Sequence, residues 1–391
     1  MSDLSYMDKL LDGVEVEWMA LGKALVRTKG TNITAGRMKE LHKDHAPLKI
    51  FAGGKTVAFV DFKDIPEENI NREPSIIVKS RGVVEFEYYT DPFSHKNEMW
   101  SYHSKNNNIN IKYVYYYLKT KELYFQGLAS RMQMPQIATP DTDKFQIPIP
   151  PLSIQAEIVQ ILDSFTELTT ELTAELTAEL IARRQQYAHY RDQLLTFKEG
   201  EVEWKALNKV CSSISAGGDL PKNFIKGQTD PTDELPYPIF ANATGDKGLY
   251  GFTDKYKIES DAVTISARGA KVGYHTVREG KFTPIIRLIT LVPNKNIILT
   301  RYLNYILDMT PIAGTKGGIP QLTVPTVKKI AIPVPPLAEQ ARIVAILDKF
   351  DALTTSLTEG LPREIALRQQ QYEYYRELLL SFPKAEVADH D

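Results

Sequence analysis

The chain has a single cysteine, Cys211, in 391 residues. One cysteine forms neither an internal disulfide nor a cysteine-rich zinc site, which is typical of proteins in a reducing cytosol. No apolar run approaches the length of about 18 residues that indicates a membrane-spanning helix. The first residues also lack the basic stretch and apolar core of a secretory signal. We therefore expect a cytoplasmic, globular protein that is not held in a membrane.

Sequence motifs for catalysis are missing as well. Asp91–Phe93 lacks one proline of the Pro-Pro-aromatic loop that adenine methyltransferases carry. Gly53–Thr56 resembles the end of a phosphate-binding loop, but that loop needs glycine at the position of Lys49. The histidines at 42, 45, 95, 103, 189, 275 and 390 show no metal-ligand spacing. We expect no catalytic residue, metal or cofactor in this chain, although a triad spread along the sequence is not excluded.

Acidic and basic side chains occur in alternating blocks. The whole chain has a net charge of −2 and a pI near 6.4, which taken alone argues mildly against a nucleic-acid partner. Residues 14–150, however, hold 19 Lys and Arg against 16 Asp and Glu, and residues 200–335 hold 17 against 12. The remaining segments therefore carry a net charge of −10. This asymmetry is more informative than the average.

What the sequence does contain is an internal repeat. The run Ile147–Leu152 recurs as Ile332–Leu337, at an offset of 185 residues. The agreement continues without a gap to Phe197 and Phe382, and it includes Gln155 with Gln340, Ile158 with Ile343, Leu162 with Leu347, Asp163 with Asp348 and Phe165 with Phe350. A second block opens each half, where Glu15–Leu21 recurs as Glu201–Leu207. Such a duplication indicates two copies of one structural plan.

Between these blocks the two halves have diverged almost completely. The remnants of similarity are Arg81-Gly82 with Arg268-Gly269, Gln136 with Gln321, and Ile50–Ala52 with Ile239–Ala241. The repeat predicts five segments: a fragment at 1–13, a first body at 14–150, a first tail at 151–199, a second body at 200–335 and a second tail at 336–391. Tails that stay alike indicate a shared task, whereas diverged bodies indicate different ligands.

The tails are predicted to be long helices. In residues 155–197 the apolar positions are spaced by three and four, with no internal glycine or proline. Gly360 and Pro362 predict a break in the second tail. Two long amphipathic helices favour an antiparallel coiled coil. Residues 1–13 match the end of the first tail, which predicts a helix end ahead of the first body and suits a pseudo-two-fold arrangement.

The first tail contains the four-residue repeat LTTELTAELTAEL at 168–180. It places leucine at Leu168, Leu172, Leu176 and Leu180, beside Glu167, Glu171, Glu175 and Glu179. One interpretation is a solvated acidic face on a helix. The other is a spacer whose length is set by the number of repeats, because each repeat adds about 6 Å of helix.

The bodies are predicted to be mixed α/β and rich in strands. The candidate strands are 75–79, 83–89, 262–266 and 287–293, and the candidate helices are 111–119 and 300–309. Loop-like stretches combine Lys and Arg, which neutralise phosphates, with Asn, which reads base edges. They supply the candidate DNA contacts Lys29, Arg81, Lys105, Lys247, Arg268, Lys271 and Lys316. A solvated loop, or for the two Arg-Gly pairs a structural turn, is the alternative interpretation of each.

A body, an Ile-Pro-x-Pro-Pro-Leu run with the following Gln and Ile-Leu-Asp-x-Phe, and a long helix occur in this order twice. This pattern resembles the specificity subunits of type I restriction-modification enzymes over nearly the whole chain. The TAEL repeats resemble the central spacer of one subfamily.

The resemblance implies that each body is a target-recognition domain that reads one half of a split, asymmetric double-stranded DNA target from the major groove. The helices would fix the distance between the bodies and dock two methyltransferase subunits, and restriction subunits with ATP-driven translocation would then join. The methyl donor and ATP would be bound by those partners. The candidate spacer and docking residues are Leu168, Leu172, Leu176, Leu180, Gln186, Tyr187, Gln371 and Tyr372.

Two other functions are compatible with parts of the sequence. One is a non-catalytic coiled-coil scaffold with two peptide- or protein-binding bodies, which would show no salt-dependent affinity for DNA. The other is a self-contained DNA enzyme, which the missing methyltransferase and nucleotide motifs disfavour.

Overall fold

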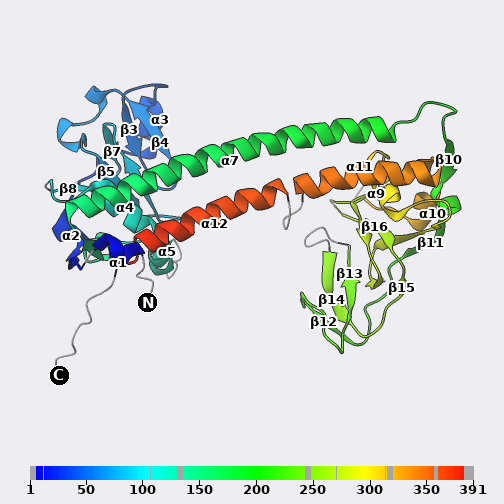
Figure 1. The fold of residues 1–391 in the computed structure, drawn as a ribbon. Coiled ribbons are helices and arrows are strands. Elements are labelled where there is room, and N and C mark those ends of the chain that lie inside the picture. Colours follow the sequence, from blue (N-terminus) through cyan, green and yellow to red (C-terminus); the bar gives the residue numbers. More distant parts are fainter. Residues whose placement is uncertain are drawn as a thin grey trace. The chain divides into compact units, whose positions relative to one another are not determined.

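The structure is a computed structural model that describes residues 6–11, 13–105, 107–129, 135–242, 248–269, 271–312, 314, 320–355 and 360–382. The chain divides into two compact units, one of Met1–Glu175 with Ile365–Asp391 and one of Leu176–Glu364 (Figure 1). Each unit therefore contains one body and parts of both tails. The predicted mixture of strand-rich α/β bodies and long helices is confirmed.

The first body is built on two sheets. In the four-stranded sheet the order is β2-β8-β5-β6 and all neighbours are antiparallel, whereas the order β4-β3-β7 contains one parallel pair, β3 with β7. The strands are β2 (Leu25–Arg27), β3 (Leu48–Phe51), β4 (Val57–Val60), β5 (Ser75–Lys79), β6 (Glu85–Tyr89), β7 (Phe93–His95) and β8 (Trp100–Ser104). β5 is one of the two interior strands, and its β-branched Ile-Ile-Val run, which suits this position, is fully buried.

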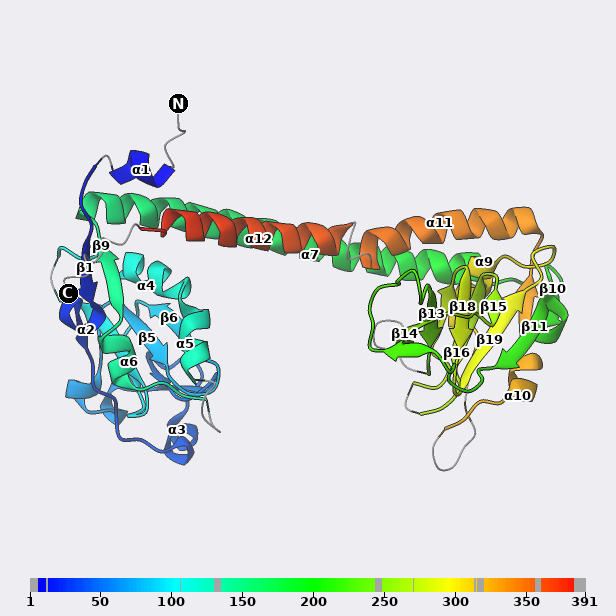
Figure 2. The same cartoon turned by 90° about the horizontal axis from the view of Figure 1, so that it is seen from below.

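Short helices surround these sheets. They are α2 (Leu21–Ala24), α3 (Ala35–Leu41), η1 (Phe62–Asp64), η2 (Glu67–Asn69), α4 (Ile111–Lys119), α5 (Glu122–Ala129) and α6 (Thr139–Asp143). The Asn110 side chain caps α4 by accepting from the N–H groups of Lys112 and Tyr113. α4 then buries Tyr113, Val114 and Leu118 against the four-stranded sheet (Figure 2).

The second body repeats this plan with a four-stranded sheet, β11-β19-β16-β17, and a five-stranded sheet, β12-β14-β13-β18-β15. Its strands are β11 (Cys211–Ala216), β12 (Phe224–Lys226), β13 (Tyr237–Phe240), β14 (Leu249–Thr253), β15 (Ile258–Glu259), β16 (Ala262–Ser266), β17 (His275–Arg278), β18 (Lys281–Pro284) and β19 (Leu288–Pro293). Its helices are α8 (Leu207–Val210), α9 (Thr300–Asp308) and α10 (Val324–Lys328). β13 and β18 form the parallel pair that corresponds to β3 and β7.

Each body begins and ends in a two-stranded antiparallel ribbon. β1 (Glu17–Ala20) pairs with β9 (Gln146–Ile149), and β10 (Glu203–Ala206) pairs with β20 (Ala331–Val334). The repeated Trp of each opening block lies opposite a repeated proline, Trp18 opposite Pro148 and Trp204 opposite Pro333. The two repeated sequence blocks are therefore the two strands of one ribbon.

The tails are helical, as predicted. The first tail forms α7 (Leu152–Leu195), a helix of 44 residues, and the second forms α11 (Leu337–Thr355) and α12 (Leu361–Leu379). Gly360 takes the left-handed conformation with φ 81° directly before α12, so the predicted break is confirmed. The N-terminal fragment contains the predicted helix, α1 (Tyr6–Leu11).

In each unit, α7 packs antiparallel against one helix of the second tail. In the first unit Phe165 contacts Tyr375 with ring centroids 5.6 Å apart, and Thr166 Oγ1 lies 3.0 Å from the Tyr372 hydroxyl of α12. In the second unit the equivalent pair is Tyr190 and Phe350 of α11, at 5.5 Å. No helix of the described residues is both long enough and apolar enough to cross a lipid bilayer.

Most predicted strands agree with the structure, and the differences have local causes. The strand predicted at 83–89 begins at Glu85, because Gly82 takes a left-handed conformation with φ 77° and its neighbours turn away. The strand predicted at 287–293 begins one residue later, because Arg287 itself has φ 61°. Strands 75–79 and 262–266 and helix 111–119 have the predicted bounds.

Candidate nucleic-acid interface

The repeated glutamine of each tail joins the tail helix to its body. Gln155 donates from Nε2 to the carbonyl oxygens of Pro150 and Asn108, at 2.7 and 3.3 Å, and accepts at Oε1 from the N–H of Asn110 at 2.8 Å. Its side chain is fully buried. Gln340 makes the equivalent bonds to Pro335, Ile297 and Leu299, at 2.8–2.9 Å. The repeated motif therefore has a structural task inside the chain.

The repeated aspartate of each tail makes a second joint. Asp163 accepts from Lys112 Nζ at 2.7 Å and from the Tyr116 hydroxyl at 2.5 Å, both on α4. The second unit repeats this with Asp348, Arg301 and Tyr305, at 2.6–2.8 Å. The sequence analysis did not identify these α4 and α9 residues. Their repeat at an offset of 189, in otherwise dissimilar segments, is the signal that would have found them.

The two Arg-Gly pairs occupy the same place in both bodies. Each arginine follows an interior strand, β5 or β16, and forms a backbone bridge to the repeated glutamine, Arg81 to Gln136 and Arg268 to Gln321. The following glycines, Gly82 and Gly269, are left-handed and donate to the carbonyls of Pro135 and Pro320, at 2.9 and 3.2 Å. The backbone of each pair therefore forms the structural turn of the alternative interpretation.

Arg268 lies in a surface cavity of about 460 Å³ in the second body. The residues that line it are Ala241, Asn242, Tyr250, Arg268, Gly269, Ile285, Ile286 and Arg287. Asn242 fixes the arginine backbone, because its Oδ1 accepts from the N–H of Ala267 at 2.6 Å and its Nδ2 donates to the carbonyl of Arg268 at 2.8 Å. Neither Asn242 nor Arg287 is a site residue that the sequence predicts.

The other candidate DNA contacts are dispersed. Lys271 lies in the β16–β17 connection with Arg268, and exposed Lys29 precedes Gly30, which approaches the backbone of Lys96. Lys105 is exposed at the far end of β8, beside the joint with the tail, so the structure separates it from Arg81. Lys247 and Lys316 lie outside the described residues.

The candidate spacer residues lie on α7 and α12. Leu168 is 52% exposed, whereas Leu172, Leu176 and Leu180 are half-buried. Tyr187 faces Phe350 at 6.3 Å, and the Tyr372 contact is described above, so both tyrosines contribute to helix packing. Gln186 accepts from Arg183 at 2.8 Å, and Gln371 from Arg368 at 3.2 Å.

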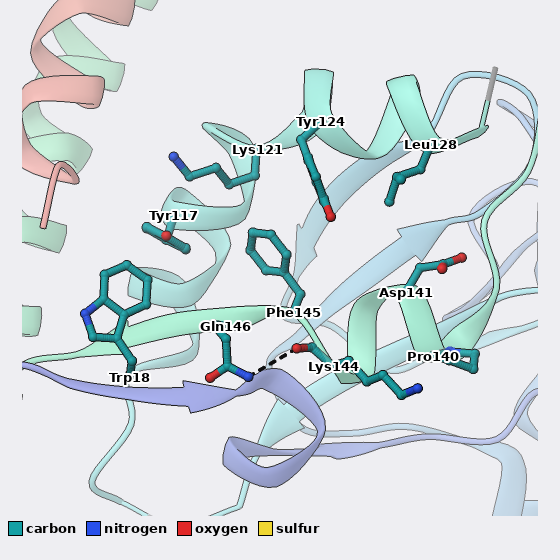
Figure 3. A pocket seen from close by; sticks show the side chains of 10 residues that line it. All are labelled: Trp18, Tyr117, Lys121, Tyr124, Leu128, Pro140, Asp141, Lys144, Phe145 and Gln146. Atoms are coloured by element: carbon teal, nitrogen blue, oxygen red, sulfur yellow. Dashed lines mark hydrogen bonds between the residues drawn. The ribbon is translucent and has the colours of Figure 1, made fainter. Parts of the chain in front are cut away.

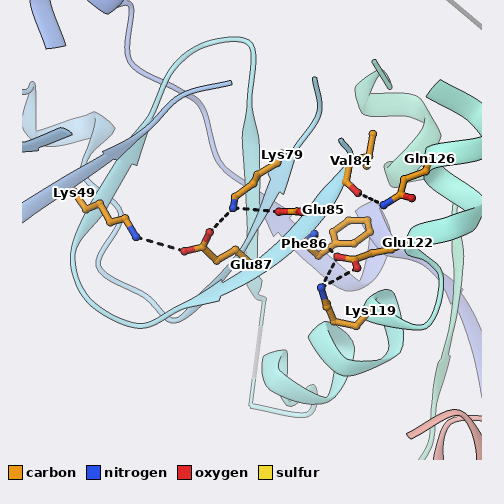
Figure 4. A network of polar contacts seen from close by, with 9 residues as sticks. All are labelled: Lys49, Lys79, Val84, Glu85, Phe86, Glu87, Lys119, Glu122 and Gln126. Carbon is orange, nitrogen blue, oxygen red and sulfur yellow. Dashed lines mark hydrogen bonds and ion pairs between the residues drawn. The ribbon is translucent and has the colours of Figure 1, made fainter. Parts of the chain in front are cut away.

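Two lysines of the first body are engaged internally. Lys79 Nζ lies 2.7 Å from Glu87 and 3.5 Å from Glu85, and Lys49 lies 3.4 Å from Glu87 (Figure 4). Burial lowers the pKa of Lys79, but the hydrogen bond and charge of Glu87, with that of Glu85, outweigh burial and raise it. With exposed side-chain fractions of 14% and 17%, Lys79 and Lys49 stabilise the sheet face and do not reach outward.

The first body has a surface cavity of about 640 Å³, and four of the ten residues that line it are aromatic (Figure 3). Trp18, Tyr117, Tyr124 and Phe145 form its walls, and Lys121 stacks over Tyr117 at 5.3 Å. The lining residues include some from the ribbon and some from α5, and Tyr124 of α5 is 53% exposed.

Chemically reactive groups are scarce in the described residues. Burial raises the pKa of Cys211 to about 12, so its thiol is neutral near physiological pH and a poor nucleophile. Among the described residues there is no group of three or more His, Cys, Asp or Glu that could hold a metal ion. The polar residues that the loops present are arginine, lysine and asparagine, which suit recognition.

Solved structures share this architecture. The S subunit of a type I restriction-modification system from M. genitalium matches 95% of this chain and 98% of its own, with a TM-score of 0.52 and 17% identity. A chain from a structure of type I R-M assembly and conformational transition matches 94% and 98%, with a TM-score of 0.63 and 17% identity. These likenesses show that the chain shares its fold, over nearly its whole length, with a type I S subunit.

Sequence comparison defines the family. Residues 33–182 and 200–367 match the type I restriction modification DNA specificity domain. The EcoR124I/EcoR124II type I specificity subunit of Escherichia coli is 35% identical over 414 residues, which cover all of both chains. The EcoprrI specificity subunit of the same species is 31% identical over 390 residues, 92% of this chain and 93% of the relative. The chain therefore belongs to the family of type I restriction-modification DNA specificity subunits, which are recognition subunits without catalysis of their own.

Proposed function

We propose that each body reads one half of a bipartite, asymmetric DNA target, so that residues 14–150 and 200–335 act as separate target-recognition domains. The main support is that the two Arg-Gly loops make the same backbone contacts. They hold arginine at equivalent places, whereas the surrounding residues differ. Two loops with the same backbone arrangement and different side chains are suited to two half-sites of different sequence. Arg81, Arg268 and Lys271 are proposed as base or phosphate contacts, and Lys29 and Lys105 as phosphate contacts.

The tails at 151–199 and 336–391, with the fragment at 1–13, are proposed to set the gap between the half-sites in a pseudo-two-fold arrangement. They are also proposed to dock two methyltransferase subunits, after which ATP-dependent restriction subunits join. The net charge of −10 outside the bodies supports a protein-facing task, because acidic helices repel DNA. The methyl donor and ATP would be bound by these partners, in the cytoplasm.

DNA binding by the purified complex of this chain with its methyltransferase subunits tests this proposal. We expect one split motif to be bound far more tightly than random duplex, with an affinity that falls as salt rises. A scaffold with two peptide-binding bodies would show no salt-dependent preference for any duplex. Absence of such a preference, in a complex shown to be assembled by sedimentation, would exclude the proposed function.

A further inference from the structure

Two backbone contacts place the loop at 96–98 of the first body in register with the loop at 285–287 of the second. The N–H of Lys96 donates to Phe51, and that of Ile285 donates to Phe240, both at 2.9 Å. A Cβ added at Gly30 would lie 2.6 Å from the Lys96 carbonyl, and one added at Gly217 would lie 2.7 Å from that of Ile285. Only glycine fits this close approach in either body.

Strand pairing gives the same register from the other side. Val78 lies opposite Trp100 in the first body, and Ile265 lies opposite Ile289 in the second. Counting back two residues from Trp100 and from Ile289 reaches Glu98 and Arg287. The two bodies therefore carry opposite charges at one structural position.

Glu98 of the first body is neutralised locally. Its carboxylate forms an ion pair with Lys96 at 2.7 Å, and its side chain is only 19% exposed. Partial burial raises the pKa of Glu98, but the hydrogen bond from Lys96 and the charges of Lys96 and Arg81 outweigh it and lower the pKa. Glu98 is thus ionised and acts only as a hydrogen-bond acceptor.

Arg287 of the second body is exposed and held in a strained backbone conformation. A φ of 61° is uncommon for any residue but glycine, and it persists only where neighbouring contacts impose it. Two backbone bonds do so here: the Arg287 carbonyl accepts from Ala267 at 3.0 Å, and Ile286 donates to Gly218 at 3.0 Å. The loop is therefore fixed before any ligand binds.

Arg287 shares its cavity with Arg268, whose backbone Asn242 holds. In the part of the chain that the structure describes, neither guanidinium has an ion-pair partner. Ile286, which is 49% exposed, lines the same cavity. Two guanidinium groups, which only donate hydrogen bonds, and an apolar side chain form a surface that complements a base edge with acceptors and a methyl group.

We propose that Arg287 reads a guanine of the second half-site together with Arg268, and that Glu98 is the counterpart that makes the first half-site different. This inference rests on the proposed function. Arginine donates two parallel bonds to O6 and N7 of guanine, whereas Glu98 at the equivalent position has no donor and is held by Lys96. The first body thus lacks, at the equivalent position, the pair of donors that the second body presents.

The test uses the chain expressed with its methyltransferase subunits, and maps methylated adenines in a host genome. Arg287→Lys keeps the charge but loses the two parallel donors of the guanidinium. We therefore expect discrimination at one base of one half-site to fall roughly 5- to 150-fold. Arg287→Ala should relax the same base, whereas Glu98→Gln, at the equivalent but internally paired position, should leave the second half-site unchanged. The matched control is Lys295→Ala, an exposed cation at the opposite end of β19.

Persistence of the unaltered half-site in the motif reports that each variant folds and assembles. An unchanged motif, an equal loss at all sites, a change in both half-sites, or loss of all methylation in both Arg287 variants would each overturn the inference. If the wild-type complex methylates no split motif, the proposed function itself fails. The two failures are therefore distinguishable.

Discussion

At the scale of single residues, the repeated motif is explained by joints within the chain. Gln155 and Asp163 each tie α7 to the start of α4, and Gln340 and Asp348 do the same for α11 and α9. Buried amides with all partners supplied by backbone are costly to replace, because the backbone groups then lose their bonds. Repetition of these residues therefore follows from the geometry of the joint.

We expect Gln155→Ala to lower the free energy of unfolding by about 1–3 kcal/mol, because it leaves buried backbone groups of Pro150 and Asn110 without partners. Urea unfolding measures this. Gln160→Ala, on the exposed side of the same helix, is the matched control and should change stability by less than about 0.5 kcal/mol. Equal effects of the two variants would show that the joint contributes nothing.

His275 should make the stability of the second unit depend on pH. Its ring nitrogens face only acceptors, the carbonyls of Gly273 and Asn304 and the carboxylate of Asp308, at 3.0–3.2 Å. Burial lowers the pKa of His275, but the bonds to Asp308 and the carbonyls outweigh it and raise the pKa above 6.5. Because the pKa of His275 is higher in the folded than in the unfolded state, His275 stabilises the fold fully at pH values below the unfolded pKa. This stabilisation is lost as pH rises through the folded pKa.

The expected result is a free energy of unfolding that decreases as pH rises above 6.5, with a smaller decrease in His275→Gln. Denaturant midpoints measured across this range provide the comparison. His189→Gln, at an exposed position of α7, serves as the control and should leave the pH profile unchanged. The same slope in all three proteins would contradict the assignment.

At the scale of elements, the acidic repeat of α7 is one part of a helix of 44 residues. Glu167, Glu171 and Glu175 are exposed, and Glu179 pairs with Arg183 at 2.6 Å. The solvated acidic face is therefore observed. The spacer interpretation concerns length and is compatible with it.

Inserting one further TAEL unit should lengthen the helix by about 6 Å, or between one and two base pairs at 3.4 Å each. We expect the gap between half-sites to change while their sequences stay the same, as determined by methylation mapping. The control, Glu171→Gln with Glu175→Gln, alters the acidic face at constant length and should leave the gap unchanged. An insertion that leaves the gap as it was would exclude the spacer role.

The sequence predicts elements better than it predicts the site. Regular spacing and the gap-free repeat suffice for α7, α11 and α12, and a β-branched run suffices for β5. The cavity of Arg268 could not be predicted, because Asn242 and Arg287 are brought to it by strand pairing between distant segments. Arg287 was assigned to a strand, since a left-handed φ at a residue other than glycine leaves no mark in the sequence.

At the scale of the whole molecule, the division of charge matches the division of labour. The bodies are basic and diverged, and the segments outside them are acidic and repeated. Basic surfaces release counterions when they bind DNA, which gives affinity without sequence preference. Discrimination then depends on the few side chains that each body presents, so each body can diverge without disturbing the joints.

The most direct measurement is a map of methylated adenines in the source cell's genome, with and without this gene. We expect loss of methylation at one split motif, two short half-sites around a fixed gap, when the gene is removed. Reintroduction of the chain should restore it. Methylation that is unchanged by removal, in cells that express the methyltransferase subunits, would contradict the role of this chain in choosing the DNA target.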